Sequence, residues 1–386
     1  MNKKVAIVTI SSHNYLPYGL NCLMSAKEFN NSYDMFYLIA DEYKKNMYSD
    51  YEKEISFLKL TEIGIPEKTL RMMEFKYNII EFNTCVKPAA ILWLFRKGYE
   101  TVIYLDPDIE CYSSFDDFLE SIKDKAVVVT PHKMTTNESQ IIKDEVFLNN
   151  GIYNLGFIAV NNSPEGVAFL NWWNSKLIDR CYINYSKGLA TDQIWVELAS
   201  TIFEGFFVCK NPGLNVAFWN LNERIIKKEN DIIMVNDVPL LFFHFSSLSL
   251  NYKKEMVDII NINNPEFESF FLMHLSKVKK YKPEFFSRIK YGFSEYSDGG
   301  KISPQERRLY GLSEKFQKDY CDPFDVNKNN CYRKRLEKVH RINVKKKTNK
   351  KEKIICISIR LFGLRKTLNF ISSFSHAETI AQIMEE

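Results

Sequence analysis

The segment that most constrains this chain is a short apolar run, rich in β-branched residues, that ends on two carboxylates at Thr101–Asp108. Such a run predicts a strand that is buried on both faces of a parallel sheet. Asp106 and Asp108 then lie where the strand leaves the sheet, the edge at which open α/β sheets bind ligands. Residues two apart in an extended chain point the same way, and Pro107 fixes φ between them. Because two carboxylates aimed at one point repel, the pattern predicts a cation there, and a divalent ion carrying a phosphorylated substrate fits best.

The composition is that of a packed globular protein, with 45% hydrophobic and 14% aromatic residues in a chain of 386. The eight cysteines are scattered and form no Cys-x-x-Cys pair. This argues against a zinc site or a secreted disulfide framework and favours a reducing cytoplasm. The N-terminal residues run directly into an apolar strand, and a polar turn follows that strand too soon for a signal peptide. No segment has an uninterrupted apolar run long enough to span a membrane. We therefore expect a cytoplasmic protein.

Strand-like and helix-like segments alternate over the first 250 residues or so, which predicts an α/β fold with a mostly parallel sheet covered by helices. Strands are expected at 5–10, 34–39, 56–60, 102–105, 126–130, 156–160 and 206–208, and helices at 16–29, 67–78, 88–96, 115–121, 164–179 and 191–199. Later segments are shorter and interrupted by Pro and Gly. We expect a main domain over residues 1–255, a helical extension over 256–327, and a basic segment with an amphipathic element over 328–386.

The net charge of +4 hides an asymmetry, because residues 328–353 hold 12 Lys and Arg against 2 Glu. A local balance of about +10 leaves about −6 for the rest of the chain. A mildly acidic body with a basic segment predicts contact between that segment and an anionic surface. We expect residues 328–374 to contact an anionic membrane, with an apolar face from 354 to 374. The alternative is a solvated linker followed by a docking helix.

A histidine inside an aromatic run, at residues 242–247, is the second candidate for chemistry. By itself such a histidine would be read as a core residue with one hydrogen bond. The carboxylate pair elsewhere needs a cation, however, and the chain has only six histidines. Two carboxylates and one imidazole suit Mn²⁺ and leave positions open for phosphate oxygens. We therefore expect Asp106, Asp108 and His244 to bind Mn²⁺, or Mg²⁺ in its place.

Three further motifs have both a functional and a purely structural interpretation. Amide side chains crowd the start of the strand at 156–160, where Asn154 could bond sugar hydroxyls and Gly156 allows close backbone approach, or ordinary turns could explain both. Thr191 is expected to cap a helix, with Asp192 and Gln193 in its first turn. Capping does not require the Asp-Gln pair, so a substrate role is expected for it.

Lys87 stands directly before Pro88, which opens a helix that ends near Gly98. A cation beside a helix N-terminus forms an anion site that backbone N–H groups complete. The alternative is a solvated lysine.

Taken in this order, the motifs resemble a glycosyltransferase of the GT-A fold, in particular the glycosyltransferase family 8-like enzymes of bacterial surface polysaccharide synthesis, such as lipopolysaccharide and capsule. The resemblance covers residues 4–250 or so. It implies that Asp106, Asp108 and His244 hold a metal ion on the diphosphate of a nucleotide sugar, with UDP as the expected nucleotide. By the same resemblance, Thr9 lies beside the nucleoside, Asn154 and Gly156 form the Asn-x-Gly motif of the donor site, and the side chains of Asn154, Asp192 and Gln193 bind or orient the sugar hydroxyls.

The chain departs from the family pattern after the histidine. The family's histidine is usually followed by Gly and then Lys-Pro-Trp, whose lysine contacts the diphosphate, and residues 244–253 lack this sequence. Lys87 or Lys253 would then make the contact to the diphosphate. A second acid after Asp192-Gln193 is also absent. If the enzyme inverts, Asp192 would take the acceptor proton, and if it retains, the leaving phosphate would take it while Asp192 or Gln193 shields the cationic sugar.

The expected reaction moves a sugar from a nucleoside diphosphate to a saccharide acceptor, and an acceptor on a lipid carrier would make membrane contact useful. A sugar-phosphate nucleotidyltransferase would use the same fold and carboxylates, but it generally needs a Gly-rich basic loop that residues 11–19 lack. A non-enzymatic nucleic-acid-binding protein is the other alternative. It is disfavoured, and no nucleic-acid partner is expected, because aromatic residues are not interleaved with the basic ones in the basic segment.

Overall fold

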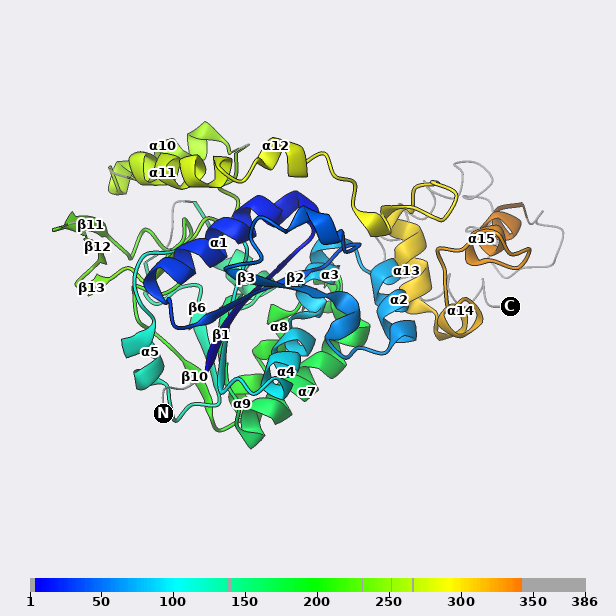
Figure 1. Ribbon diagram of the computed structural model, residues 1–386, viewed down its shortest axis with the longest axis horizontal. Coiled ribbons are helices and arrows are strands. Elements are labelled where there is room, and N and C mark those ends of the chain that lie inside the picture. The colour runs from blue at the N-terminus through cyan, green and yellow to red at the C-terminus, as the bar shows by residue number, and fades with distance from the viewer. Residues whose placement is uncertain (1–3, 138–140, 231, 251, 266, 342–386) are drawn as a thin grey trace. The chain divides into compact units, whose positions relative to one another are not determined.

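The computed structural model describes residues 4–137, 141–230, 232–250, 252–265 and 267–341 (Figure 1). The chain forms two compact units, the first built from residues up to 64 and from 83–291, the second from residues 65–82 and from 292 onwards. Most of the expected membrane segment, including its apolar part at 354–374, lies outside the described residues. The domain limits expected at residues 255 and 327 stay predictions.

Seven strands form the central sheet of the first unit, in the order β10-β6-β7-β4-β1-β2-β3. Neighbouring strands pair in parallel except at β7 (Tyr153–Asn161), which is antiparallel to both β4 and β6. The expected mostly parallel α/β sheet is therefore confirmed. The other strands are β1 (Val5–Ser11), β2 (Asp34–Ile39), β3 (Ile55–Lys59), β4 (Thr101–Leu105), β6 (Val127–Pro131) and β10 (Phe206–Val208).

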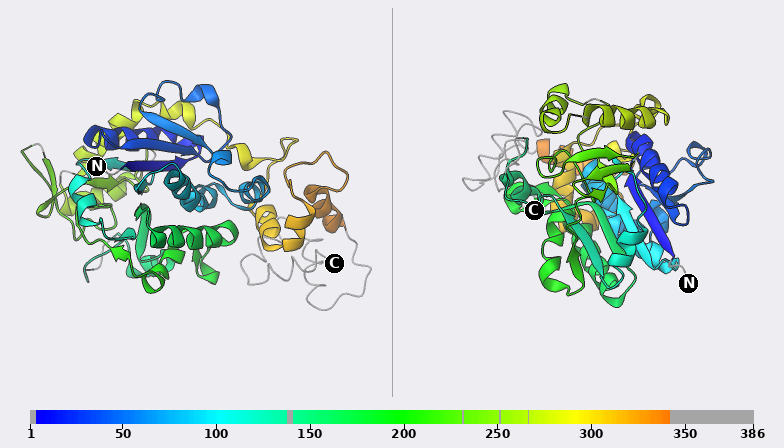
Figure 2. Two further views of the ribbon diagram at one scale, coloured as in Figure 1. Left: turned by 60° about the horizontal axis from the view of Figure 1, so that its bottom comes forward. Right: turned by 90° about the vertical axis from the view of Figure 1, so that its left-hand side faces the viewer.

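Helices cover both faces of this sheet. On β1, Val5 and Ile7 belong to the core that includes apolar residues of α1 (Leu16–Phe29). Successive side chains of a strand point to opposite faces, so Ala6 and Val8 point to the other face of the sheet. The helices α4 (Lys87–Arg96) and α7 (Pro164–Arg180) cover that face (Figure 2). Burial on both faces explains why β1 and β4 are mostly apolar instead of alternating between apolar and polar residues.

The carboxyl ends of β1 and β4 form a topological switch point of the sheet. From β1 the chain continues to β2 and β3 on one side, and it returns to place β4 on the other side. Such a point is where open α/β sheets bind ligands. The turn η1 (His13–Tyr15) leaves β1 at this edge, and Asp106 follows β4 there. Because β7 is antiparallel, its first residues, including Asn154, reach the same edge.

Smaller elements complete the first unit. Helices α10 (Lys254–Asn263) and α11 (Phe267–Lys279) pack their inner sides on Phe243 and Phe245. The remaining strands are β5 (Ile109–Cys111) paired with β14 (Phe242–His244), β8 (Ile183–Asn184) with β9 (Leu189–Ala190), and β11 (Ile226–Glu229), β12 (Ile232–Val235) and β13 (Val238–Pro239) as a third small sheet. The remaining helices and turns are α3 (Ile79–Cys85, where the chain re-enters this unit), α5 (Asp116–Ser121), α6 (Asp144–Asn150), α8 (Gln193–Val196), α9 (Ala199–Ile202), α12 (Pro283–Phe286), η2 (Lys45–Met47), η3 (Leu60–Glu62) and η4 (Tyr185–Lys187).

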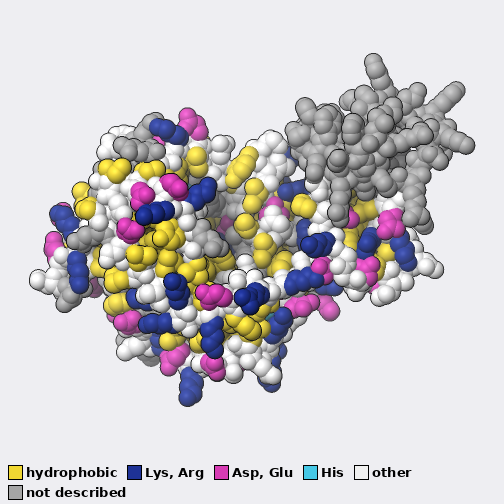
Figure 3. Space-filling view, turned by 90° about the horizontal axis from the view of Figure 1, so that it is seen from above, with side chains coloured by type: hydrophobic (Ala, Val, Ile, Leu, Met, Phe, Trp, Pro, Cys, Tyr) yellow, Lys and Arg dark blue, Asp and Glu magenta, His cyan; other side chains and the backbone are white. Residues whose placement is uncertain are grey.

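The outer sides of α10 and α11 carry exposed apolar residues, among them Ile262 and Met273. Figure 3 shows hydrophobic side chains interspersed with Lys and Arg on the face of the molecule seen from above. Within the described residues, no helix combines the length and the apolar character needed to cross a membrane.

The second unit is a small helical body around Phe75. Tyr310, Phe324 and Tyr332 contact the Phe75 ring edge-on, with centroid distances of 5.0 to 5.5 Å. The buried guanidinium of Arg307 donates to backbone carbonyls of this body, including that of Phe75 at 2.6 Å. Its elements are α2 (Glu67–Lys76), η5 (Gly292–Ser294), α13 (Pro304–Leu312), α14 (Glu314–Asp319) and α15 (Tyr332–Arg341).

A buried ion-pair cluster ties α1 and α11 to β5, the strand that follows Asp108. The side chain of Glu110 is fully buried, and Nδ2 of Asn21 donates to its Oε2 at 3.0 Å. Nδ1 of His274 lies 2.6 Å from the same oxygen, and the ammonium of Lys277 contacts Oε1. Burial by itself would raise the pKa of Glu110, but His274 and Lys277 outweigh it and lower the pKa from 4.5 to about 2.

The Glu110→Gln variant should lose about 3 kcal/mol of unfolding free energy at pH 7, since it leaves a buried histidine and a partly exposed lysine without their carboxylate. The folded pKa of Glu110 is lowered, so its contribution is complete above the unfolded pKa of about 4.5 and falls as the pH drops towards 2. Urea unfolding at pH 7 and at pH 3 should therefore show a smaller difference between variant and wild type at pH 3. Glu52→Gln, at an exposed carboxyl, is the control. Unchanged stability of Glu110→Gln at pH 7 would contradict the assignment.

Candidate metal centre

The pairing of β5 with β14 brings His244 next to Asp108. β5 follows Asp108 directly, and its antiparallel register sets His244 opposite Ile109. The backbone N–H of Phe245 donates to the carbonyl of Asp108 at 2.8 Å, and that of His244 donates to the carbonyl of Val216 at 2.7 Å. These bonds fix the backbone that carries the imidazole relative to the carboxylates.

The three residues that the sequence singled out converge. One ligand atom from each of Asp106, Asp108 and His244 lies within 4.8 Å of the others. Nε2 of His244 is 3.0 Å from Oδ1 of Asp108 and 3.8 Å from Oδ2 of Asp106. A set of two oxygens and one nitrogen suits a divalent ion that keeps positions open for substrate.

The other ring nitrogen of His244 has its own partner, as a metal-binding histidine requires. Nδ1 lies 3.1 Å from Oδ1 of Asn215. An amide oxygen only accepts, so Nδ1 carries the proton and Nε2 is the nitrogen that faces the carboxylates. The residues present therefore fit a divalent metal ion.

The charges of His244 and Asp108 depend on each other. Burial opposes the charged imidazole, but Asp108 and then Asp106 outweigh it and raise the pKa of His244. Burial would also raise the pKa of Asp108, and the imidazole outweighs it and lowers that pKa. A divalent ion would take the place of the proton on Nε2, because only the neutral ring nitrogen can bind a metal.

Lys87 directs its ammonium into the protein and not into solvent. Its side chain is 2% exposed, and Nζ lies 2.9 Å from Oδ2 of Asp192 and 3.5 Å from Oδ1 of Asp106. Nζ also donates to the carbonyl of Leu155 at 2.9 Å. Burial lowers the pKa of the lysine, but Asp106 and Asp192 outweigh it and raise that pKa. The anions that meet Lys87 here are protein carboxylates, whereas the sequence suggested a phosphate.

The expected helix cap at Thr191 is wrong. Thr191 has a left-handed φ of 51°, and its hydroxyl donates to Oδ1 of Asp192 at 3.1 Å instead of capping α8. Asp192 stands at the N-cap position without a side-chain capping bond, because its carboxylate pairs with Lys87. Nε2 of Gln193 donates to the carbonyl of Asn150 at 2.6 Å, which ties the start of α8 to the end of α6.

Thr9, Asn154 and Gly156 lie at the same edge of the sheet and bond to protein groups. The hydroxyl of Thr9 donates to the carbonyl of Leu105 at 2.7 Å and so joins β1 to β4 at the switch point. Nδ2 of Asn154 lies 3.1 Å from a ring nitrogen of His132, while its Oδ1 accepts from the backbone N–H of Gly156. A Cβ at position 156 would lie 2.4 Å from Cε1 of His244. The close approach expected at Gly156 is therefore made here by the imidazole.

Several side chains of this site were not identified from the sequence. Tyr15, on η1, has a pKa raised by burial and then by Asp108, which indicates its proximity to the carboxylates. The hydroxyl of Tyr104 donates to Asp106, and the ring of Trp219 contacts that of His244 edge-on at 5.2 Å. Asn215 follows a Pro-Gly turn in the sequence, and no local signal connects it with a histidine in a different strand.

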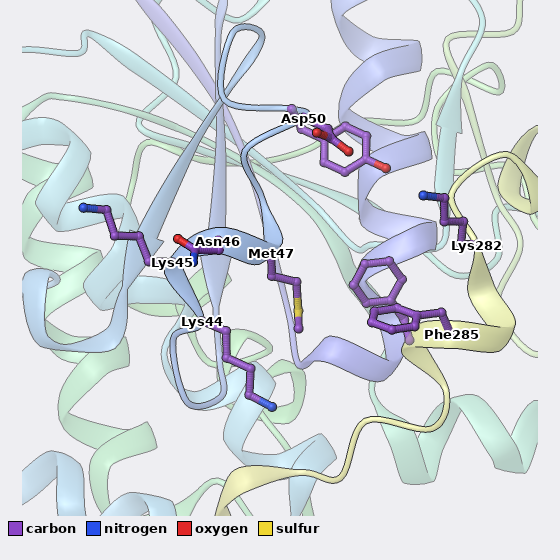
Figure 4. A pocket seen from close by; sticks show the side chains of 9 residues that line it. Lys44, Lys45, Asn46, Met47, Asp50, Lys282 and Phe285 are labelled. Atoms are coloured by element: carbon purple, nitrogen blue, oxygen red, sulfur yellow. The ribbon is translucent and has the colours of Figure 1, made fainter.

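A separate cavity of about 600 Å³ lies in the first unit between residues 44–51 and α12 (Figure 4). Its lining residues are Lys44, Lys45, Asn46, Met47, Asp50, Tyr51, Lys282, Phe285 and Phe286, and none belongs to the metal centre. Figure 4 shows the ammonium groups of Lys44, Lys45 and Lys282 far apart from one another. They do not converge on one point, as a site for a single phosphate would require.

No protein-family model matches the chain. Two uncharacterized proteins of Bacillus subtilis (strain 168) are similar in sequence. YfnF is 22% identical over 67% of this chain and 88% of its own length. YfnD is 22% identical over 75% of this chain and 93% of its own length.

Among solved structures, the chain is similar to the galactosyltransferase LgtC in complex with donor and acceptor sugar analogs, with 13% identity over 66% of this chain and 95% of that one and a TM-score of 0.43. The glycosyltransferase GlyE of Streptococcus pneumoniae TIGR4 is 12% identical over 75% of this chain and 66% of that one, with a TM-score of 0.41. At such low sequence identities, the function has to be inferred from the side chains of the site.

The close contact at Gly156 can be tested with a double-mutant cycle. Gly156→Ala should cost about 1–3 kcal/mol of unfolding free energy, because its methyl group occupies the space of the His244 ring. In a His244→Ala background that ring is gone, so the same substitution should cost clearly less. Urea unfolding of the wild type, both single variants and the double variant gives the interaction energy between residues 156 and 244. Equal costs in the two backgrounds would show that the imidazole does not need the glycine.

Proposed function

We propose that this protein is a metal-dependent glycosyltransferase of the GT-A fold, similar to glycosyltransferase family 8. It moves a sugar from a nucleoside diphosphate sugar, with UDP as the expected nucleotide, to a saccharide acceptor. The observation that carries the proposal is the convergence of Asp106, Asp108 and His244 at the switch point between β1 and β4. A nucleotide placed at that edge has its phosphates beside the metal ligands.

Within this proposal, Asp106, Asp108 and His244 hold Mn²⁺ or Mg²⁺. The ion, when bound, neutralises the negative charge that builds on the diphosphate as the sugar leaves. The ammonium of Lys87 lies 3.5 Å from Asp106, so it places a positive charge beside that ligand and acts on the diphosphate through it.

The donor lies across the carboxyl ends of β1 and β4. Thr9 holds these two strands together beside the nucleoside, and Tyr15 offers an aromatic ring at the end of β1. Asp192 and Gln193 act at the transferred sugar. Asp192 is held by Lys87, and Gln193 is partly exposed at the start of α8.

The rival nucleotidyltransferase function is not favoured. Such an enzyme needs basic groups in the loop after the first strand. The side chain there that could be basic is His13, which is buried and bonded to Asp41 at 2.9 Å and to the hydroxyl of Tyr48 at 2.7 Å. His13 therefore has no free ring nitrogen for a phosphate.

The role in surface polysaccharide synthesis at the cytoplasmic membrane face is part of the proposal and is supported by the charge of residues 328–353. Vesicles that contain anionic lipid should bind the full chain more strongly than neutral vesicles, with an affinity that falls as salt is added. A chain that ends at residue 341 keeps α15 and should lose most of this binding. Equal sedimentation of both chains with anionic vesicles would remove the membrane contact from the proposal.

The central test of the proposal is a metal-dependent donor assay. Purified protein should hydrolyse or transfer sugar from one member of a panel of nucleotide sugars with Mn²⁺, and lose this activity with chelator. Asp108→Asn keeps the size of the side chain but removes its charge, and should lower the rate by about 10²–10³-fold. Asp124→Asn, at an exposed carboxyl, is the matched control and should keep the wild-type rate. Full activity in chelator, or in Asp108→Asn, would refute the metal-dependent mechanism.

A further inference from the structure

We propose that Asn215 is the positioning residue that makes His244 a metal ligand through Nε2, and that Asn154, Thr130 and His132 act by fixing the amide of Asn215. This inference deepens the proposed function and depends on it, because it concerns the metal of the same site. It assigns Asn154 to the support of the histidine instead of to the sugar hydroxyls.

The first step is the bond between Asn215 and His244. Nδ1 of the imidazole lies 3.1 Å from Oδ1 of the amide, and both side chains are buried. If the amide were turned by 180°, its NH₂ group would face Nδ1, and the ring proton would be displaced to Nε2. The nitrogen that faces Asp106 and Asp108 would then carry a proton and could not bind a metal. The orientation of this one amide therefore decides which ring nitrogen is available.

The second step is that two neighbours fix this orientation. Nδ2 of Asn215 lies 2.9 Å from Oγ1 of Thr130 and 2.9 Å from Oδ1 of Asn154. An amide nitrogen donates through two hydrogens, and here each hydrogen has an acceptor. Turning the amide would set its oxygen against the oxygen of Asn154 and would leave buried groups unpaired, which costs about 1–3 kcal/mol for each group.

The third step fixes Asn154 in turn. Oδ1 of Asn154 accepts from the backbone N–H of Gly156 at 3.1 Å as well as from Asn215, so this atom has to be the oxygen. Its NH₂ group then faces Nε2 of His132 at 3.1 Å. Burial lowers the pKa of His132 to about 4, so this ring is neutral at pH 7 and its Nε2 can accept. The direction of every bond from His132 to His244 follows.

The backbone shows that Asn215 is held at this position. Its φ of 53° is left-handed, a conformation that Asn, Asp and Gly adopt more readily than other residues. Nδ2 of Asn220 donates to the carbonyl of Asn215 at 3.1 Å, while Oδ1 of Asn220 accepts from the backbone N–H of Ala217. On another side of the imidazole, the ring of Trp219 packs edge-on. The loop that carries Asn215 thus also supplies a contact to the His244 ring.

The test compares two substitutions that both suit a left-handed backbone. Asn215→Gly removes the acceptor, and Asn215→Asp keeps an oxygen that can accept from Nδ1. Asn230→Gly is the matched control, because Asn230 also has a left-handed φ, of 48°, and lies exposed between β11 and β12. Full-length proteins are titrated with Mn²⁺ alone, and binding is followed by electron paramagnetic resonance. Pulsed measurements on bound Mn²⁺ then report whether an imidazole nitrogen is coordinated.

Asn215→Gly should weaken Mn²⁺ binding by about 10- to 100-fold and lose or reduce the nitrogen coupling. Asn215→Asp should keep the coupling and most of the affinity, and Asn230→Gly should match the wild type. Wild-type affinity and coupling in Asn215→Gly would overturn the inference and leave the proposed function intact. Equal losses in Asn215→Gly and Asn230→Gly would also overturn it. A wild-type protein that binds no Mn²⁺, or binds it without nitrogen coupling, would instead refute the proposed metal site.

A second variant keeps the inference testable if Asn215→Gly does not fold. Thr130→Val retains the volume of the side chain but removes one of the two acceptors that orient the Asn215 amide. It should weaken Mn²⁺ binding in the same direction, by a smaller factor than removal of the amide itself. Unchanged Mn²⁺ affinity and unchanged nitrogen coupling in folded Thr130→Val would contradict the inference that Thr130 orients the Asn215 amide.

Discussion

The structure of the site depends on the antiparallel pairing of β5 with β14. This short ladder takes a histidine from late in the chain and sets it beside the two carboxylates that follow β4. Nε2 of His244 is 3.0 Å from Asp108 because the register places residue 244 opposite Ile109. A shift of one residue would turn the imidazole to the other face of the ladder. The packing that holds the ladder is therefore part of the site: α10 and α11 pack on Phe243 and Phe245, and Glu110 anchors β5 to α1 and α11.

Charge is balanced within the site in two separate ways. Asp108 is paired with an imidazole, and Asp192 is paired with the buried ammonium of Lys87, which also lies near Asp106. An unpaired carboxylate buried as deeply as that of Asp192 would be strongly disfavoured. A metal ion can replace the imidazole proton, whereas Lys87 provides a permanent positive charge. This division suits the proposed glycosyl transfer, because Asp106 and Asp192 would keep a counter-charge when a negatively charged diphosphate leaves.

Much of the fold could be predicted from local sequence patterns. The strands β1, β2 and β4 and the helices α1, α4 and α7 begin and end within a residue or two of their expected limits, since hydrophobic runs and Pro or Gly boundaries are local signals. Thr191 shows where this reasoning fails. A threonine before Asp-Gln looks like a helix cap, but the buried charge of Lys87 draws the Asp192 carboxylate away from the helix and the backbone turns left-handed. A tertiary ion pair outweighed a local preference.

By itself, the sequence determined the alternation of strands and helices, the position of the carboxylate pair at the end of a buried strand, and His244 as the third candidate ligand. Local chemistry was enough for the alternation and the carboxylate pair, because strand periodicity and residue type are written in consecutive residues, whereas His244 became a candidate only because that distant pair needs a cation. Only the tertiary structure decided that Lys87 meets carboxylates, that Gly156 makes room for a ring, and that the amide of Asn215 sets the proton on His244. These features depend on residues that lie far apart in the chain and meet only when the sheet edge is assembled, and no pattern of neighbouring residues encodes such contacts.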